Sequence, residues 1–347
     1  MTINYAQLFC TVADLVADKQ APGIDESRMY QAIKEASDVM QKEIGWFLPV
    51  TMTRLLRGSG TQRLFVPPLL SITSILNYAF ISTPVTLTTD DYLLLPNNGF
   101  WANGPYAEIV FQINRIGMVW SNYPNGVQID GRWGMYERSG DTGATVQDTT
   151  QQSASQLTLK VSNGGKVSPG MVLLIGTEQE SVTGWDAPTA SVTTLNGAIT
   201  ASDDLLTVTD GSLVHVGELL RLDFEQMKVK DIRANQISVI RNWNGTGKVA
   251  HADNCPVDVY RTVTVERGMN GTTAATHATS TAISRYFVPD DILYLTKEIA
   301  TLSANKALSG YQGRTGNAET GVVFYNDAFP KFDIDKVKNN YYIPRIR

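Results

Sequence analysis

The segment Tyr92-Leu93-Leu94-Leu95-Pro96-Asn97, read together with Val127-Gln128-Ile129-Asp130-Gly131-Arg132-Trp133-Gly134, decides the fold that the sequence predicts. The first is an extended apolar run that ends in a Pro-Asn-Asn-Gly turn, and the second ends in Gly-x-Trp-Gly. Between them lies another run, residues 106–113, in which Glu108 and Gln112 interrupt the apolar positions. Patterns of this kind are typical of half-buried strands. We expect these three segments to form a small antiparallel sheet.

Helical patterns precede and follow these strands. In residues 2–17 and 26–47 apolar side chains recur every three or four positions, and Asp25 suits the N-cap of the second helix. After residue 287 the periodicity returns, with Pro289 at a helix start. The sequence therefore predicts an α+β fold in which N-terminal helices and a C-terminal helix pack on the small antiparallel sheet.

The chain divides into a discontinuous core and a β-rich insertion. Residues 1–137 and 288–321 form the expected core domain, and residues 138–155 are an expected linker because they lack periodicity and are rich in small polar residues. Residues 156–287 consist of short β runs with glycine turns. Residues 322–347 are aromatic and lack a long helical stripe, so we expect a C-terminal arm that becomes ordered on a partner surface.

The insertion contains an internal repeat. A front half that begins near residue 161 recurs near residue 208, and a back half, residues 239–246, recurs as 265–272. The order is front, front, back, back, whereas tandem duplication would give front, back, front, back.

This order predicts one β module inserted inside another. The expected outer module is 156–191 plus 262–287, and the expected inner module is 192–261. Strands interleaved from a duplicated half-module are the alternative.

Ten residues of the repeat are candidate structural residues. We expect the glutamates to accept hydrogen bonds from arginine or backbone, and Asn-Gly-Thr is a tight-turn signal. The repeated histidines are either metal ligands or partners of a turn; we favour the second because no cysteine or carboxylate stands at ligand spacing in the sequence. The residues are Glu178, Glu225, Arg241, Asn244, Gly245, His251, Arg267, Asn270, Gly271 and His277.

Composition argues against several classes of protein. The net charge of the 347 residues is -5, which does not suit a protein that coats nucleic acid, although DNA can still pass it. Cys10 and Cys255 are expected to be unpaired thiols in a reducing compartment. No apolar run approaches the roughly 18 residues of a membrane span, and no signal segment precedes the first helix. We expect a soluble protein made in a cytoplasm.

No motif with catalytic chemistry is present in the sequence. It has no Gly-rich phosphate loop, no His-Glu-x-x-His, no Cys-x-x-Cys and no Gly-x-Ser-x-Gly. The 3 histidines all lie in the insertion, and the paired aspartates stand at turns or at a helix start. We therefore expect no enzyme, no cofactor and no metal.

Arginines and tryptophans outside the insertion have two interpretations each. The arginines of the polar stretch that follows the second helix belong either to a solvated loop or to a contact with a partner or with passing DNA. The tryptophans near the sheet are expected to anchor a core or interface rather than stack on a ligand. These residues are Arg54, Arg57, Arg63, Trp101, Trp120 and Trp133.

Three short motifs occur in an order that resembles one family. They are a helical Tyr-x-x-Ile-x-x-Ala-Ser at 30–37, an Asp-Tyr-x-Leu-x-Pro strand at 91–96 and a Gly-x-Trp-Gly close at 131–134. On these motifs, residues 1–137 and 288–347 resemble the head–tail connector (neck adaptor) proteins of tailed bacteriophages. The residues that carry the resemblance are Tyr30, Ile33, Ala36, Ser37, Tyr92, Leu94, Pro96, Gly131, Trp133 and Gly134.

The resemblance implies a structural virion protein. Its subunits, commonly twelve in such rings, would form a ring below the portal that extends the DNA channel and joins head to tail. The implied partners are other copies of the chain, the portal protein and a tail or next neck protein, and DNA would pass without sequence-specific binding. The implied location is the virion neck, after synthesis in the host bacterial cytoplasm. The candidate portal contacts on the arm are Tyr341, Tyr342, Ile343 and Arg345.

The insertion departs from the compact pattern of this family, so the resemblance implies no partner for it. The alternative function is a phage tail, whisker or fibre-associated β-module protein that binds a host surface glycan or another virion protein. That function predicts surface aromatics concentrated in residues 156–287, whereas only Trp185 and Trp243 of the tryptophans lie there.

Overall fold

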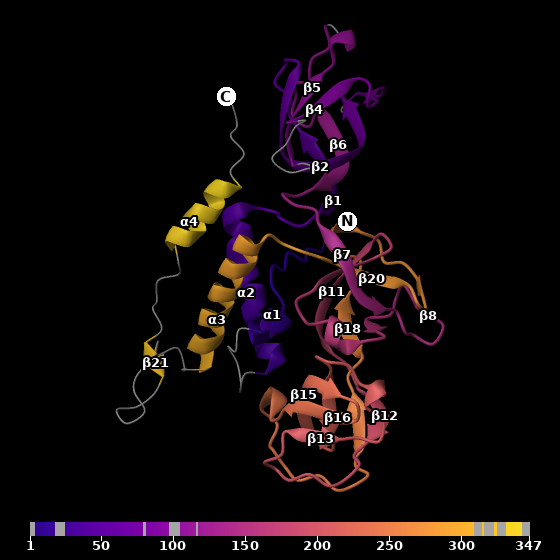
Figure 1. The fold of residues 1–347 in the computed structure, drawn as a ribbon. Helices are drawn as coiled ribbons and strands as arrows, with labels where there is room; N and C mark the ends of the chain where they lie inside the picture. Colours follow the sequence, from indigo (N-terminus) through magenta and orange to yellow (C-terminus); the bar gives the residue numbers. More distant parts are fainter. Residues whose placement is uncertain are drawn as a thin grey trace.

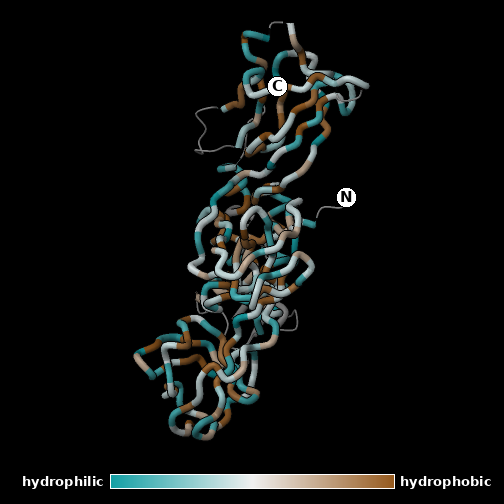
Figure 2. The backbone as a smooth tube through the Cα atoms, turned by 90° about the vertical axis from the view of Figure 1, so that its right-hand side faces the viewer, coloured by the Kyte–Doolittle hydropathy of each residue, from teal (hydrophilic) through white to brown (hydrophobic). Residues whose placement is uncertain are grey.

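The protein is a mixed α+β molecule in which three β bodies form a column and a layer of helices lies beside it (Figure 1). Seen from the side, the three bodies stand one above another (Figure 2). This computed structural model describes residues 4–17, 25–78, 81–96, 105–115, 117–308, 314–315, 323–324 and 331–341. Among these residues, no helix combines the length and the hydropathy needed to cross a membrane.

The first body is a six-stranded antiparallel sheet, which we call the frame sheet. Its order is β1-β6-β2-β5-β4, with β3 paired to β2. The three expected strands belong to this one sheet, but β2 lies between β5 and β6. The strands are β1 Val50–Leu56, β2 Arg63–Asn77, β3 Val85–Leu87, β4 Tyr92–Leu95, β5 Tyr106–Phe111 and β6 Val127–Trp133, and the short helix η1, Ile113–Arg115, follows β5.

Strand β1 corrects the expectation of a loop around Arg54. Val50 pairs with Trp133 and Leu56 with Val127, so Arg54 lies in a strand. The polar side chains of β1 concealed its alternation, because Arg54 takes a place on the half-buried face. Its guanidinium stacks on the rings of Trp46 and Trp133, at 4.8 and 4.9 Å from their centroids.

The frame sheet fills its own core. Phe111 stacks on Trp120 at 4.4 Å between ring centroids, and the Trp120 indole donates to the Gln62 carbonyl. Trp120 and Trp133 are fully buried, as expected of core anchors, whereas Trp101 lies outside the described residues. Trp120 packs with the strands, so the frame sheet has a core of its own, separate from the core of the helices.

The helices therefore pack elsewhere, and the expectation that they cover the frame sheet is wrong. Helices α2 and α3 lie side by side, with α1 and α4 against them. Their core is shared with the second body, because it includes Val172, Met269 and Tyr286 of the outer β module. The helices are α1 Val12–Ala17, α2 Glu26–Ile44, α3 Asp290–Leu308 and α4 Lys331–Asn340.

Helix α4 corrects the expectation that residues 322–347 lack structure of their own. Ile334 and Val337 are buried in the helical core. Tyr341, directly after the helix, packs edge-on against Phe47 and donates its hydroxyl to Asp291 at 2.7 Å. The helical stripe was too short to detect, because two buried residues one turn apart give little periodic signal. Residues 314–315 and 323–324, strands β21 and β22, pair with each other.

The outer module is the second body and also has six strands. Its order is β7-β20-β10-β11-β18-β9. Val182 in β11 stands opposite Val265 in β18, the pairing that the nested arrangement predicts. The strands are β7 Ser139–Thr145, β9 Thr158–Lys160, β10 Val172–Ile175, β11 Glu178–Trp185, β18 Thr262–Glu266 and β20 Ala282–Tyr286; β8 Gln151–Gln152 pairs separately with β19 His277–Ala278.

The predicted linker is wrong for residues 138–155, because β7 and β8 lie within it. Strand β7 pairs along β20, with Tyr286 opposite Ser139. Only Ala144 of β7 is buried. An edge strand that buries one side chain is held by its backbone hydrogen bonds, so the sequence showed no apolar alternation there.

The inner module is the third body, at the far end of the column from the frame sheet (Figure 1). Its strand order is β12-β17-β14-β15-β16-β13. Because β12 belongs to this sheet, the chain enters the inner module before residue 192, the predicted boundary. The strands are β12 Thr189–Thr194, β13 Leu205–Thr207, β14 Leu219–Leu222, β15 Glu225–Arg233, β16 Gln236–Ile240 and β17 Pro256–Val259.

An ion pair with one buried partner, Glu218, joins the two modules where the chain returns to the outer one. Arg261 donates to both carboxylate oxygens of Glu218, at 2.7 and 2.9 Å. The same carboxylate accepts the Gly164 amide of the outer module at 3.1 Å. Glu218 is fully buried, so the contact fixes one module against the other in a region of low dielectric constant.

The Asn-Gly-Thr turn of the outer module holds the N-terminal segment. Asn270, fully buried, accepts the Ala6 amide at 2.9 Å and donates to the Ala6 carbonyl at 3.0 Å. The next residue, Gly271, has φ +76°, and a Cβ there would collide with the Thr51 carbonyl of the frame sheet. The repeated turn therefore joins the outer module to both the N-terminal segment and β1.

Replacing Asn270 with alanine should lower the free energy of unfolding by about 2–4 kcal/mol, since the buried Ala6 amide and carbonyl both lose their partner. Urea unfolding followed by circular dichroism measures the change. The matched control is Asn244→Ala at the equivalent position of the inner module, where the half-exposed side chain caps a helix and about 1 kcal/mol is expected. An effect at position 270 no larger than at 244 would contradict this role.

Candidate functional site

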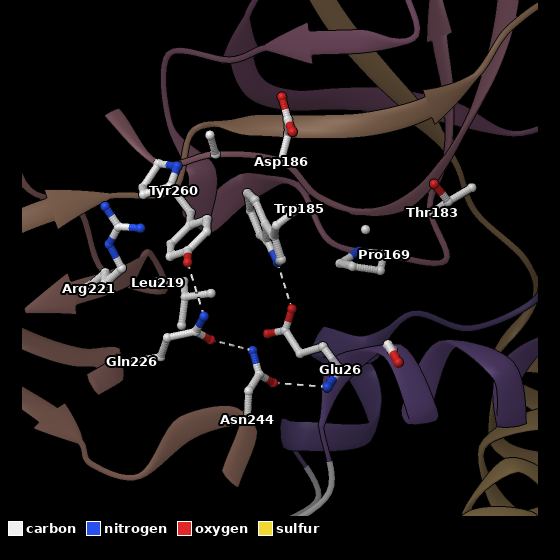
Figure 3. A pocket seen from close by; sticks show the side chains of 14 residues that line it. Glu26, Pro169, Thr183, Trp185, Asp186, Leu219, Arg221, Gln226, Asn244 and Tyr260 are labelled. Carbon is white, nitrogen blue, oxygen red and sulfur yellow. Dashed lines mark hydrogen bonds between the residues drawn. The ribbon is translucent and has the colours of Figure 1, made fainter. Parts of the chain in front are cut away.

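The candidate site is the junction where the N-terminus of α2 meets both β modules (Figure 3). Asp25 caps this helix, because its side chain accepts the Arg28 amide at 2.7 Å. The cap places Glu26, the first helical residue, between the end of β11 in the outer module and the Trp243 turn of the inner module.

Glu26 is a buried carboxylate held by both modules. Its two oxygens accept the indole N–H of Trp185 at 2.6 Å and of Trp243 at 2.8 Å. Lys228 lies 3.9 Å from the carboxylate and over both indole rings. Burial lowers the pKa of Lys228, and the negative charge of Glu26 opposes that shift. The two modules and the helix are thus coupled through one charged group.

A second set of hydrogen bonds links the inner module to the same helix end. Asn244 accepts the Glu26 amide at 2.9 Å and donates to Gln226 at 2.6 Å. Gln226 in turn donates to the Tyr260 hydroxyl at 3.0 Å. The side chains form a continuous chain across the junction in Figure 3.

A pocket of about 440 Å³ opens at this junction. Trp185 and Tyr260 give it aromatic walls that meet edge to face, with 6.3 Å between ring centroids. Asp186 and Arg221 are charged groups in its lining, and Arg221 is paired with Asp258 at 2.6 Å. Aromatic walls with a few polar groups suit the binding of a small polar molecule.

The repeated glutamates and arginines form two equivalent buried clasps, as the repeat predicts. In the outer module Arg267 donates to both oxygens of Glu178 at 2.8 Å, and His277 lies 2.9 Å from the same carboxylate. In the inner module Arg241 makes both bonds to Glu225 at 2.6 Å. Each arginine also donates to backbone carbonyls of the front half of its module. The clasps therefore fix front half to back half, which no local interaction would do.

The second carboxylate of each clasp comes from a different position. In the outer module Glu180, fully buried, lies 3.1 Å from Arg267 and 3.5 Å from His277. Its repeat equivalent in the inner module is Met227, and there Asp223 contacts the histidine instead, 2.8 Å from His251. Each module thus sets two carboxylates against one arginine and one histidine.

The structure corrects the statement that His251 lacks ligand partners. Asp223, His251 and Cys255 lie with their donor atoms within 4.8 Å of one another. Cys255 follows His251 by four residues, which is an ordinary ligand spacing that the sequence reading overlooked. Asp223 is distant in sequence and reaches the pair because it lies in the β14–β15 turn. In the outer module the donor atoms of Glu178, Glu180 and His277 also lie close together. There the positive charge of Arg267 is paired with both carboxylates.

The outer clasp should make stability depend on pH in two directions. Glu180 and Glu178 raise the pKa of His277 above its usual 6.5, so its contribution is complete below about pH 6.5 and is lost as pH rises through the raised value. Burial acts to raise the pKa of Glu178, but hydrogen bonds, first from Arg267, hold it below its usual 4.5. Its contribution is complete above about pH 4.5 and is lost as pH falls through the lowered value.

We therefore expect the melting temperature of His277→Gln to fall less steeply above pH 6.5 than that of the wild-type protein. Its fall below about pH 4.5, which depends on Glu178, should be unchanged. Thermal unfolding at intervals between pH 3 and pH 9 provides the measurement. If the melting temperatures of the wild-type protein and the variant fell in parallel above pH 6.5, the charge of His277 would not stabilise the fold.

The candidate arginines have partners within the protein. Arg54 stacks between two tryptophans, Arg57 donates to the Asn122 carbonyl at 2.7 Å, and Arg63 pairs with Glu108. Arg63 and Arg57 are nevertheless exposed. The structure does not bring the three together at one surface site, since Arg54 belongs to the half-buried face of β1.

The other candidate residues divide between described and undescribed parts of the chain. Tyr341 is buried in the helical core, which contradicts its assignment as a portal contact, whereas Tyr342, Ile343 and Arg345 lie outside the described residues. The motif residues of α2 face the core, and Ser37 accepts the Phe9 amide at 3.2 Å. Gly131 lies where a Cβ would collide with the Ser71 carbonyl of β2. Tyr92 and Trp133 are buried in the frame sheet.

Sequence reasoning missed the central residue of the junction, Glu26, and its partner Lys228. In the sequence Glu26 looks like any acidic residue in the first turn of a helix, where the helix dipole favours a negative charge. Lys228 lies in a β run, and no acidic residue close to it in sequence suggests Glu26 as its partner. The one available signal was the pair Trp185 and Trp243, which are the only tryptophans of the insertion.

Comparisons of the chain with protein-family models, with curated proteins and with solved structures find no match. A proposal of function therefore depends on the geometry of the molecule and on the short motifs of its sequence.

Proposed function

We propose that the protein is a structural subunit of the neck of a tailed-bacteriophage particle, a head–tail adaptor with a nested double β module. It assembles with other copies of itself into a ring, docks below the portal and passes DNA through the ring without sequence-specific binding. The role is structural rather than catalytic. The motif residues support the proposal, since they shape α2, β4 and β6, the elements on which the resemblance was drawn.

The observation that carries the proposal is a column with apolar residues exposed in both terminal bodies. In the frame sheet body Ile113 is 88% exposed, and in the inner module Phe224 is 93% exposed. The two bodies lie at opposite ends of the column, with the outer module between them and the helices beside it (Figure 1). A single exposed apolar side chain does not mark an interface by itself. The support comes from the elongated column, which presents one such residue in each terminal body and so suits a bridge between two layers of an assembly.

Negative-stain microscopy and mass photometry of the purified protein, alone and mixed with its portal protein, test the proposal. Annular particles or portal-bound rings are expected. A protein that remains monomeric and ignores the portal would refute it. For the arm, truncation after Tyr341 is the appropriate variant, because it retains the buried tyrosine and removes Tyr342, Ile343 and Arg345. Loss of portal attachment with unchanged thermal unfolding is expected.

The junction pocket favours a second function, binding of a glycan by the β modules. An aromatic wall with a charged group beside it suits a small polar ligand such as a sugar, and Trp185 and Asp186 provide these two features. A glycan array probed with the wild-type protein and with Asp186→Ala separates the two functions. Glycan binding by the wild-type protein that Asp186→Ala loses would support this second function. If the wild-type protein bound no glycan, the second function would be refuted and the adaptor proposal would be unaffected.

A further inference from the structure

The inner module brings three metal-binding side chains together at one edge. Asp223 lies in the turn between β14 and β15, and His251 and Cys255 lie in the segment between β16 and β17. His251 Nδ1 is 2.8 Å from an Asp223 oxygen, and Cys255 Sγ is 3.6 Å from the same oxygen. Imidazole, thiolate and carboxylate are the three side-chain ligands that zinc takes in proteins.

The buried side of the cluster already has the support of a metal site. The other nitrogen of His251, Nε2, lies 3.1 Å from the buried carboxylate of Glu225 and can donate a hydrogen bond to it. In that tautomer Nδ1, on the side of Asp223, is free to bind a metal ion. Arg241 fixes that carboxylate with two hydrogen bonds at 2.6 Å. A ligating histidine whose second nitrogen donates to a carboxylate is the usual outer-shell arrangement of zinc sites.

The outer module provides an internal comparison. It has the same histidine, glutamate and arginine, at His277, Glu178 and Arg267. At the positions equivalent to Asp223 and Cys255 it has Gly176 and Thr281. The shared histidine, glutamate and arginine form the clasp in both modules, and Asp223 takes the place beside the histidine that Glu180 has in the outer module. The feature that the inner copy adds is a thiol, Cys255, beside that carboxylate.

We propose that Asp223, His251 and Cys255 bind one zinc-like divalent transition metal ion, with a fourth position open to water. Ligands at 2.0–2.3 Å from a tetrahedral ion stand about 3.4 Å apart, so the cysteine–aspartate separation already fits and the aspartate must withdraw slightly from the histidine. Asp223 can do so, because its side chain is 56% exposed whereas that of His251 is fully buried. The ion joins the β14–β15 turn to the segment before β17.

Titration of the full-length protein with Co²⁺ tests the site, since a thiolate ligand gives cobalt a near-ultraviolet charge-transfer band. The wild-type protein and the matched control Cys10→Ser, which changes the other buried cysteine, should each bind one equivalent and show the band. Cys255→Ser should lose the band, and Zn²⁺ should bleach it in the wild-type protein. The wild-type melting temperature should rise with Zn²⁺, since an ion that binds only the folded state stabilises it.

The absence of a band in the reduced wild-type protein, or an equally strong band in Cys255→Ser, would overturn the proposal. Asp223→Asn decides the matter if Cys255→Ser does not fold, since Asp223 is exposed and its replacement leaves the core intact. Its Co²⁺ affinity should fall at least about tenfold, a loss that outer-shell changes alone already produce. Unchanged affinity in Asp223→Asn would equally overturn the assignment.

Discussion

Replacing Glu26 with alanine should lower the free energy of unfolding by about 3–5 kcal/mol, one of the two largest single effects expected in this protein. The carboxylate is 5% exposed and is the common partner of two indoles and one ammonium group. Its removal leaves Trp185 and Trp243 with unpaired N–H groups and leaves Lys228 as a partly buried cation without its nearest counter-charge. Breaking one partner of a buried pair is costly for this reason.

Chemical denaturation measures the loss, and hydrogen exchange shows where it acts. Exchange should rise at the start of α2, at Trp185 and at Trp243 together, because one group couples all three. Ser27→Ala, at the next and exposed position, should change little. The double variant Glu26→Leu with Lys228→Met should recover part of the stability, since it removes both charges. A double variant less stable than Glu26→Ala would show that packing, rather than the unpaired cation, causes the loss.

Replacing Arg267 with alanine should cost a similar 3–5 kcal/mol or so and should affect most of the molecule. Arg267 is the cation for two buried carboxylates, Glu178 and Glu180, and it donates to carbonyls of both halves of the outer module. The outer module also supplies part of the core on which the helices pack. Loss of this clasp should therefore loosen the module and the helical layer together.

The repeat supplies the control for this prediction. Arg241→Ala breaks the equivalent clasp of the inner module, which lies at the end of the column and has a separate core. Hydrogen exchange should then rise within residues 189–259 and stay low in the outer module. Arg233→Ala, at an exposed arginine of the same module, should leave exchange unchanged. If Arg267→Ala and Arg241→Ala gave identical exchange maps, the expectation that only the outer module supports the helical layer would be refuted.

The internal repeat was the most productive signal in the sequence. Because two copies carry the same residues, the repeat marked Glu178, Glu225, Arg241 and Arg267 as structural residues and predicted that the glutamates accept hydrogen bonds that hold front half to back half. The order of the halves also predicted that Val182 and Val265 lie in neighbouring strands, as they do. These inferences were possible because both modules have the same turn and the same buried charge pair, so the residues that form them occur in both copies.

Elements without an apolar pattern escaped prediction. Strand β1 carries Arg54 on its half-buried face, and β7 buries only Ala144, so neither shows clean alternation. Both are held by pairing with strands distant in sequence, and such backbone pairing leaves little trace in side-chain type. The helical stripes were visible in the sequence, but the surface they cover was not, because an apolar stripe does not specify its partner.

The sequence by itself determined the mixed α+β class, the helical stripes of α2 and α3, the turns of the repeat and the order of its halves. All of these depend on local periodicity or on two copies of one pattern. Only the tertiary structure decided that the helices pack on the outer module, that Glu26 joins both modules and that Asp223, His251 and Cys255 meet. Trp185 and Trp243 stand 159 and 217 residues from Glu26. Contacts between residues so far apart in sequence form when complete helices and strands pack together. The intervening residues do not specify that packing through any local pattern.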